Sequence, residues 1–214
     1  STPPYTSWET AADSIQKCIN ICVDGDTVYV ANGVYKENLV INTAISLIGS
    51  SMDSTVIDGT GLGDYTVYFR NSGEIKNFSI YGRGEQVFTS RVIYSNVLTN
   101  LVYVNGCKLT NAGVGIGMGG GDLIADNLII TGTTRGINLF GSNFNSVSNC
   151  IINTDNEGGQ GINVGFAGSV EYKINNNIIL FAGDRFTNPD YGITAQYPHH
   201  IEIYNNLISG FSNN

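Results

Sequence analysis

The sequence is short of charged residues. Only 13% of its 214 residues are Asp, Glu, Lys or Arg, against roughly a quarter in an average soluble domain. Asn, Ser, Thr and Gly carry the polarity instead, which is typical of stacked strands joined by tight turns rather than of surface helices held by ion pairs. The net charge of −8 argues against nucleic acid as a partner, because phosphate binding needs clustered Lys and Arg.

Long apolar runs and metal-binding cysteine pairs are also lacking. No apolar stretch approaches the roughly 20 residues that a membrane helix needs, so we expect no membrane insertion. The four cysteines, Cys18, Cys22, Cys107 and Cys150, show no CxxC spacing, which argues against a zinc site. We expect them to be small core residues.

An internal repeat organises the chain. Six stretches share an apolar residue, any residue, Asn, two further residues and another apolar residue. The Asn column contains Asn77, Asn127, Asn149, Asn176 and Asn205, with Gly106 in the remaining copy. Asn and Gly both tolerate left-handed backbone angles, and stacked Asn amides can bond to one another. We therefore expect these residues to occupy one corner of a stack of coils.

A glycine column follows the Asn column. Gly115, Gly136, Gly161 and Gly192 each precede an isoleucine in a second strand-like stretch. A repeat of about 20–30 residues built from short strands predicts a solenoid, because one coil cannot bury its inner face and stacked coils share an apolar column. We therefore expect an all-β fold, a single right-handed parallel β-helix.

The start of the chain predicts a cap for this solenoid. Residues 7–22 form an amphipathic pattern with Ser7 as the candidate N-cap. A helix there would cover the end of the sheets and prevent edge pairing. We expect one domain over residues 1–214, with a capping α-helix at 7–22 and coils at 24–214. No cap is evident after the last coil, so we expect the coils to continue in a longer protein.

Loops of unequal length fall at the corner between the Asn strand and the Gly strand. They are short at 81–85, 110–113 and 131–134, and longer at 153–160 and 180–191. Long loops on one flank of a solenoid usually form its binding face. We therefore expect the functional site on this flank.

Charged and aromatic residues gather in the two longer loops. The candidate catalytic residues are Asp155, Asp184 and Arg185. The candidate substrate-binding residues are Glu157, Asp190, Tyr191, Arg135 and His199. Of these, His199 lies at a different corner, in the turn before the last Asn strand. Three further charged residues lie on the flank or at its edge, namely Arg83, Glu85 and Arg91.

Three kinds of chemistry are open to this flank. Asp155 and Asp184 could act as the carboxylate pair of a glycoside hydrolase. Alternatively, Asp155, Glu157 and Asp184 could hold calcium, which takes six to eight oxygen ligands. The metal would then bind a uronate, and Arg185 or a lysine would remove its acidified α-proton. In the third alternative nothing is catalytic, because Asp, Asn and Gly are also the residues that turns need.

The sequence from Gly25 to Gly59, "GDTVYVANGVYKENLVINTAISLIGSSMDSTVIDG", resembles the first coils of the pectin-lyase-like superfamily. The later Gly-Ile and Asn units resemble its β-helix repeat, so that the resemblance covers nearly the whole chain. The catalytic signatures transfer only in part. "NTD" at 153–155 and "GDR" at 183–185 are similar to the "NTD" and "GDD" of polygalacturonases. Their "HG" and "RIK", the pectate-lyase "WIDH" and the pectin-esterase "DFIFG" are missing.

The resemblance implies a carbohydrate-active protein. With the loop clustering, it leads us to expect a secreted or cell-surface enzyme that cleaves a polysaccharide, as a glycoside hydrolase or a polysaccharide lyase. Calcium is the one cofactor under consideration. The alternative is a non-catalytic surface, adhesin or glycan-binding module, which the lack of a complete catalytic motif favours.

Overall fold

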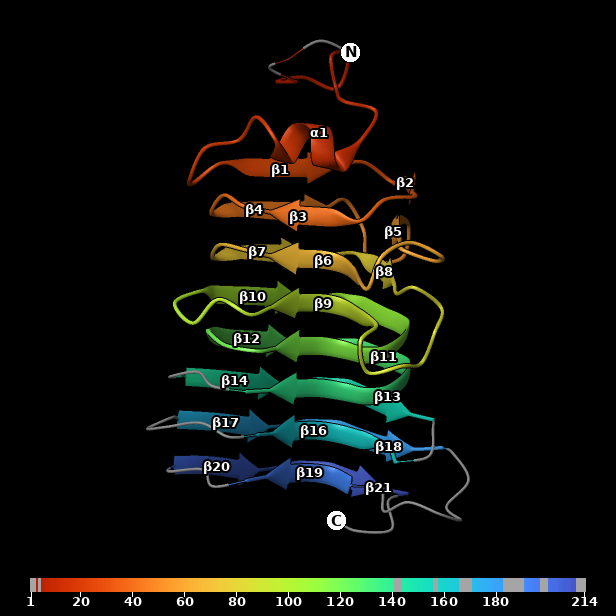
Figure 1. The fold of residues 1–214 in the computed structure, drawn as a ribbon, viewed down its shortest axis with the longest axis vertical. Coiled ribbons are helices and arrows are strands. Elements are labelled where there is room, and N and C mark those ends of the chain that lie inside the picture. The colour runs from red at the N-terminus through yellow and green to blue at the C-terminus, as the bar shows by residue number, and fades with distance from the viewer. Residues whose placement is uncertain are drawn as a thin grey trace.

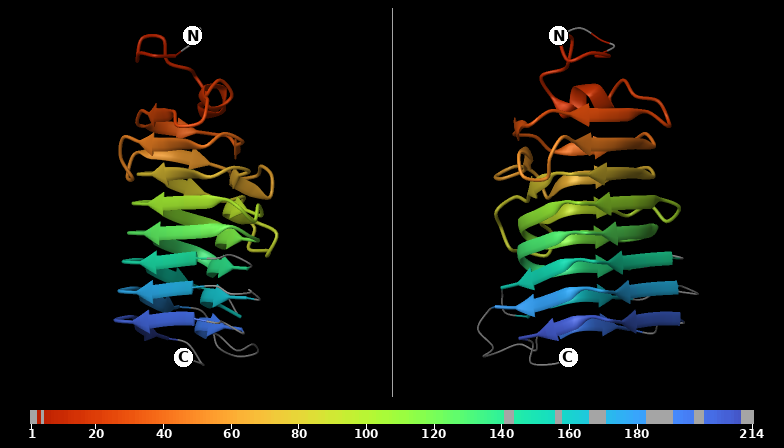
Figure 2. Two further views of the ribbon diagram at one scale, coloured as in Figure 1. Left: turned by 90° about the vertical axis from the view of Figure 1, so that its left-hand side faces the viewer. Right: turned by 180° about the vertical axis from the view of Figure 1, so that it is seen from behind.

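The chain forms a stack of β-strand coils along one axis (Figure 1). This computed structural model describes residue 3 and residues 5–140, 144–155, 158–165, 171–182, 191–196 and 200–210. The strands of successive coils pair in parallel. Side and rear views show the same stack, with the one short helix at its N-terminal end (Figure 2). No helix in the described part of the chain is long and apolar enough to cross a membrane.

The strands form three walls. Wall A is the sheet of β1 (Thr27–Val30), β4 (Ile45–Gly49), β7 (Gly73–Lys76), β10 (Leu101–Asn105), β12 (Asp122–Asp126), β14 (Phe144–Ser148), β17 (Glu171–Asn175) and β20 (His200–Tyr204). Wall B contains β2 (Gly33–Tyr35), β5 (Thr55–Asp58), β8 (Ser79–Tyr81), β15 (Ile151–Thr154), β18 (Ile178–Phe181) and β21 (Leu207–Ser209). Wall C contains β3 (Leu39–Ile41), β6 (Tyr65–Phe69), β9 (Arg91–Ser95), β16 (Gln160–Val164) and β19 (Tyr191–Ala195).

Two long strands belong to both wall B and wall C. They are β11 (Lys108–Met118) and β13 (Ile129–Leu139). The first part of β11 pairs with β8 in wall B, and its second part pairs with β9 in wall C. The strand β13 divides in the same way between β15 and β16. In these two coils the strand therefore continues through the corner between walls B and C without a loop.

The inward residues of the three walls form one apolar column. In β10, Val102 and Val104 are fully buried while Tyr103 between them is exposed, because successive side chains of a strand point to opposite faces. Equivalent inward positions of wall B repeat this burial from coil to coil. They are Ile57, Ile80, Leu109, Ile130, Ile152 and Ile179.

The Asn column lies at the corner between walls A and B, as predicted. The five column asparagines have φ angles between 54° and 61°, and Gly106 has a φ of 57°. Among side-chain-bearing residues, Asn tolerates this left-handed conformation best. The column recurs because each coil turns through the same corner with the same backbone geometry.

The glycine column marks the place where wall C approaches wall B most closely. A Cβ atom on Gly136 would overlap Cγ2 of Ile152 and lie 2.5 Å from the carbonyl oxygen of Gly161. Gly161 stands in the same relation to Ile179 and to the carbonyl oxygen of Gly192. A side chain at these two positions has no space, so the close approach requires glycine there, whereas the equivalent positions of β6 and β9 are Thr66 and Val92.

The capping helix is shorter than the predicted 7–22. The helix α1 (Ile15–Ile19) begins after Ser14, which replaces Ser7 as the N-cap. Its two isoleucines are buried at the end of the apolar column. The preceding segment forms only a turn, and its Trp8 is 63% exposed. Without an apolar contact, a short segment in water does not gain enough to form a helix.

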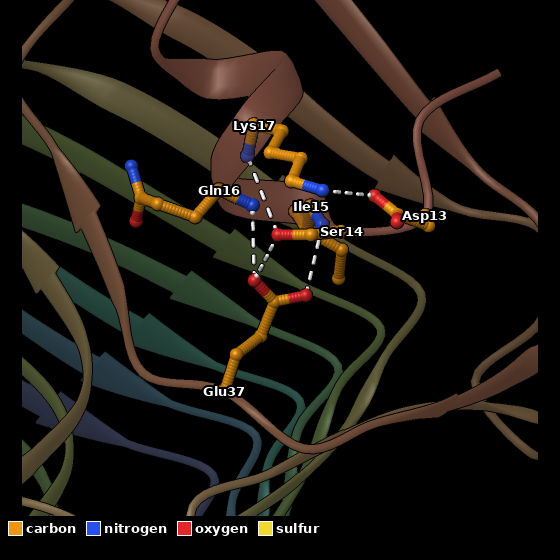
Figure 3. A network of polar contacts seen from close by, with 6 residues as sticks. All are labelled: Asp13, Ser14, Ile15, Gln16, Lys17 and Glu37. Atoms are coloured by element: carbon orange, nitrogen blue, oxygen red, sulfur yellow. Dashed lines mark hydrogen bonds and ion pairs between the residues drawn. The ribbon is translucent and has the colours of Figure 1, made fainter. Parts of the chain in front are cut away.

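Glu37 attaches α1 to the first coil (Figure 3). Its Oε1 accepts a hydrogen bond from the Ile15 N–H at 2.8 Å. Its Oε2 accepts hydrogen bonds from the Ser14 hydroxyl at 2.8 Å and from the Gln16 N–H at 3.1 Å. The first N–H groups of a helix lack intrahelical partners, and the helix dipole favours negative charge there. One carboxylate from the link between β2 and β3 thus satisfies the start of the cap.

All four cysteines are free thiols, as expected of core residues. Cys107 and Cys150 are fully buried in the apolar column, with Leu128 in the coil between them. Burial raises the pKa of both thiols to about 12, because desolvation disfavours the thiolate. Cys18 lies in α1 and Cys22 follows it, and both are half-buried against the apolar column.

Candidate functional site

The flank that the sequence singles out is the corner between walls B and C. The predicted short loops at 110–113 and 131–134 are wrong, because these residues belong to the continuous strands β11 and β13. In one coil β15 ends at Thr154 and β16 begins at Gln160, and in the next coil β18 ends at Phe181 and β19 begins at Tyr191. The two longer interruptions therefore fall on adjacent coils at this corner.

A third loop reaches the same flank from an earlier coil. Residues 82–90 link β8 to β9, so this loop is longer than the predicted 81–85, and it descends beside β11 towards β13 (Figure 1). A Cβ atom on Gly113 would overlap the Val87 carbonyl group, so the loop lies directly on the corner. Phe88 is 52% exposed, and its ring centre lies 4.3 Å from the guanidinium carbon of Arg135.

The first residues of the wall C strands form a row along this corner, which we call the corner ladder. Its register partners are Tyr65, Arg91, Val114, Arg135, Gln160 and Tyr191. Neighbouring members are about 4.8 Å apart along the axis. The ladder brings Arg135 and Tyr191, both predicted as substrate-binding residues, into one row with Gln160 between them.

Buried polar atoms of this corner lack partners. Among the described residues, Nε of Arg135, Oε1 of Gln160 and Oδ1 of Asn153 are buried without a hydrogen bond. Burial also lowers the pKa of the Arg135 guanidinium, because desolvation disfavours its charged form. Unpartnered buried polar atoms are exceptions in native proteins. A ligand or water at this corner would gain hydrogen bonds from them.

Aromatic and cationic side chains cover the N-terminal part of wall C. The rings of Tyr65 and Tyr94 stack with centres 4.4 Å apart at an angle of 15°. Tyr68 is tilted against both rings, with centres 5.3 and 5.4 Å away. The Arg91 guanidinium carbon lies 4.7 Å from the Tyr94 ring centre, and that of Arg70 lies 5.0 Å from the Tyr68 ring centre. We call these five residues the tyrosine–arginine shelf.

A row of amide side chains continues from the shelf along the outer face of wall C. The register partners in this outer ladder are Tyr68, Tyr94, Gly117, Asn138, Asn163 and Thr194. Asn163 Nδ2 donates to Asn138 Oδ1 at 2.6 Å, and the Thr194 hydroxyl donates to Asn163 Oδ1 at 2.6 Å. The polar, partly aromatic surface extends beyond the shelf through half-buried residues of the corner ladder, namely Arg135, Gln160 and Tyr191. Asn138 and Asn163 of the outer ladder are buried and bond to each other.

Of the predicted catalytic residues, the structure places Asp155. This exposed residue directly follows β15, where the longer interruption begins. The other candidates in the loops and turns lie outside the described residues, namely Asp184, Arg185, Glu157, Asp190 and His199. The carboxylate pair and the calcium site therefore stay predictions. Within the described ranges, no group of three or more His, Cys, Asp or Glu side chains gathers into a metal-binding cluster.

The strands of wall C themselves bring no carboxylate, histidine, lysine or cysteine to this flank. The sequences of β3, β6, β9, β16 and β19, and of residues 114–118 and 135–139, contain no Asp, Glu, His, Lys or Cys. General acid–base catalysis needs a titratable group within hydrogen-bond reach of the reacting atoms. A catalytic carboxylate on this flank therefore has to come from the links between strands, where Asp155 lies.

Two hollows on wall A contain charged side chains that are already paired. They measure about 220 and 390 Å³ and share Glu74 and Tyr103. Glu74 forms an ion pair with Lys76 at 2.6 Å. Asp126 accepts three hydrogen bonds from neighbouring side chains. These charged groups are less available to a ligand than the arginines of wall C, and we therefore place the candidate site on wall C.

Sequence reasoning missed most of the shelf. It placed Arg91 at the edge of the flank but did not single out the three tyrosines. The signal is present in β6, "YTVYF", and β9, "RVIYS", where an aromatic or cationic first residue is followed by Tyr three positions later. Only the register between the two strands shows that these side chains meet.

Comparison with known proteins identifies the fold. No protein-family model matches the sequence, and no curated protein matches it. Solved structures do match. The pectin methylesterase PemA from Erwinia chrysanthemi is 16% identical with a TM-score of 0.62, over 87% of this chain and 67% of that chain. The carrot pectin methylesterase is 10% identical with a TM-score of 0.63, over 94% of this chain and 81% of that chain.

A third match is a pectin methylesterase solved in complex with a hexasaccharide, 15% identical with a TM-score of 0.60. It covers 85% of this chain and 66% of that chain, so the chain spans about two thirds of its length. At these identities the likeness shows the fold. The chain is a right-handed parallel β-helix with the pectin-lyase-like fold, as the sequence resemblance predicts.

Proposed function

We propose that this protein binds a polysaccharide along wall C and modifies it with residues of the adjoining loops. The observation that carries the proposal is the tyrosine–arginine shelf and its continuation into the two ladders. Flat aromatic faces stack on sugar rings, while guanidinium and amide groups form hydrogen bonds to hydroxyl and carboxylate oxygens. The structural likeness to pectin methylesterases, one of them solved with a hexasaccharide, supports this kind of ligand.

Cleavage of a glycosidic bond is the reaction that we favour. In a hydrolase, Asp155 and Asp184 would serve as the two carboxylates of the reaction. In a lyase, calcium held by Asp155, Glu157 and Asp184 would bind a uronate, and Arg185 would take the α-proton. The proposal includes a secreted or cell-surface location for the protein.

A non-catalytic glycan-binding module is the second candidate. The observation in its favour is the lack of carboxylates, histidines, lysines and cysteines on the described strands of wall C. Such a module would use the same shelf and ladders, and its loops would contribute only contacts.

A panel of acidic and neutral polysaccharides, each with and without calcium, separates these candidates. New reducing ends with the ultraviolet absorbance of an unsaturated uronate identify a lyase, and reducing ends alone identify a hydrolase. Release of alcohol or acid without chain cleavage identifies an esterase, the activity of the similar structures. Retardation in a polysaccharide-containing gel without any product identifies a binding module. Absence of both binding and product across the panel contradicts the proposal.

Two substitutions then test the loop residues. Asp155→Asn and Asp184→Asn keep the turn-forming side chain and remove its charge. In a hydrolase each is expected to lower the rate by about 100-fold or more, on the scale of a lost general acid or base. Asp53→Asn is the matched control, because Asp53 is an exposed carboxylate of the wall A to wall B corner that pairs with Lys108. Unchanged rates in both loop variants would remove these residues from the site.

A further inference from the structure

The arginines of wall C form no ion pair with any carboxylate in the described part of the chain. Among the described residues, Arg83 is the arginine that forms ion pairs, and it does so with two carboxylates. Arg70, Arg91 and Arg135 lie against aromatic rings instead. The chain has 18 acidic and 10 basic residues, so carboxylates are not scarce. Within the described ranges, this wall thus combines three guanidinium groups with aromatic rings rather than with carboxylates.

The Arg91 side chain is held in place before any ligand arrives. Its guanidinium carbon lies 4.7 Å from the Tyr94 ring centre and 5.7 Å from that of Tyr65. Its Nη1 donates to the Thr89 carbonyl oxygen at 3.2 Å. Gly117 provides the space for it, because a Cβ atom there would lie 2.7 Å from the Arg91 Cδ. A guanidinium has five N–H donors in a rigid fork, so most of them are available to a ligand.

We propose that Tyr65, Tyr94 and Arg91 form a subsite for a carboxylated sugar, and that the polysaccharide of this protein is therefore acidic. The inference rests on the proposed function and names its substrate class. The planar guanidinium of Arg91 matches a carboxylate with two parallel hydrogen bonds, which a neutral sugar hydroxyl group does not provide. Arg70 follows β6 on the neighbouring coil in one direction along the axis, and Arg135 lies two coils away in the other. Both meet further carboxylates of the same polymer.

The net charge of the protein limits where an acidic polymer can bind. A chain of net charge −8 repels polyanions, so an acidic polymer binds only where local cations reverse the field. The shelf supplies two such cations, and the corner ladder supplies Arg135. Binding should therefore weaken as salt screens these charges.

Affinity gel electrophoresis tests the subsite without reference to catalysis. The probes are polygalacturonate, alginate and hyaluronan, each paired with the same polymer whose carboxyl groups have been reduced to alcohols. We expect at least one acidic polymer to bind at least about tenfold more tightly than its reduced form, the scale of one bidentate charged hydrogen-bond pair. Arg91→Gln should remove most of this preference, and Arg91→Lys should leave an intermediate affinity, because it keeps the charge and loses the fork.

Lys108→Gln is the control, because it removes one positive charge from the outer face of wall B, where Lys108 already pairs with Asp53. Lys108→Gln should leave the affinities for the acidic polymer and for its reduced form unchanged. Equal binding of the acidic and reduced polymers, or an equal loss from Arg91→Gln for both, overturns the subsite but leaves the proposed function standing. Binding of no polymer at all overturns both. If Arg91→Gln does not fold, the salt dependence of the wild-type protein decides, because a flat response for the acidic polymer contradicts the inference.

Discussion

Replacing Gly161 by alanine probes the contact on which wall C depends. A Cβ atom at this position would overlap Cγ2 of Ile179 and lie 2.5 Å from the Gly192 carbonyl oxygen. The isoleucine side chain can move, whereas the carbonyl group belongs to the backbone of β19, which pairs with β16. The substitution therefore forces either the strand or the corner outwards.

The loss of unfolding free energy in Gly161→Ala can be worked out from these two contacts. Overpacking a core usually costs about 1–3 kcal/mol, and a backbone oxygen that cannot retreat places this case near the upper end. Gly→Ala also restricts the unfolded chain, which returns about 0.4–1 kcal/mol. We expect Gly161→Ala to lower the free energy of unfolding by about 2 kcal/mol.

Gly192→Ala is the matched control in the next coil. The nearest atoms to a Cβ there all belong to the Ile208 side chain, which is only half-buried. We expect a loss below about 1 kcal/mol, because this side chain can yield. Urea denaturation followed by circular dichroism measures both variants. Equal losses, or a Gly161→Ala variant as stable as the wild type, would refute the close-approach argument.

Further predictions concern the cap, the thiols and the flank. Glu37→Ala removes three hydrogen bonds from the start of α1 and should lower the free energy of unfolding by about 2 kcal/mol, measured by urea denaturation; an unchanged midpoint contradicts the cap. An alkylating reagent at pH 8 should label Cys107 and Cys150 only after denaturation, because burial raises the pKa of both to about 12. Unfolded thiols ionise near pH 8.5, so their contribution to stability should be complete below that pH and decline towards pH 12; labelling of the native protein would contradict this. Phe88→Ala removes the cation–π contact with Arg135 and should lower the free energy of unfolding by about 0.5–1 kcal/mol, the scale of one exposed contact of this kind; an unchanged urea midpoint would contradict this.

Local rules made much of the fold predictable from the sequence. The Asn column was recognisable because left-handed backbone angles select Asn and Gly wherever they occur. The buried thiols were recognisable because cysteines without metal-binding spacing are commonly small core residues. Arg135 and Tyr191 were assigned to one flank because each adjoins a column glycine, and the structure confirms that they share a ladder.

Other features depended on contacts that no local pattern contains. The amphipathic pattern at 7–22 predicted a long helix, but only the part that meets the apolar column and Glu37 is helical. The loop at 82–90 was underestimated because its length shows only in where β9 begins. Its contact with Arg135 joins coils that the repeat treats as independent.

The solenoid, its Asn corner and its apolar column were therefore readable in the chain, since each depends on alternation or on a single backbone angle that recurs in every coil. The tyrosine–arginine shelf emerged only in three dimensions. Tyr65, Tyr94 and Arg91 meet because β6 and β9 pair in one particular register and because Gly117 leaves space beside them. Register between coils depends on the lengths of the intervening links, and in this chain those lengths vary from one coil to the next.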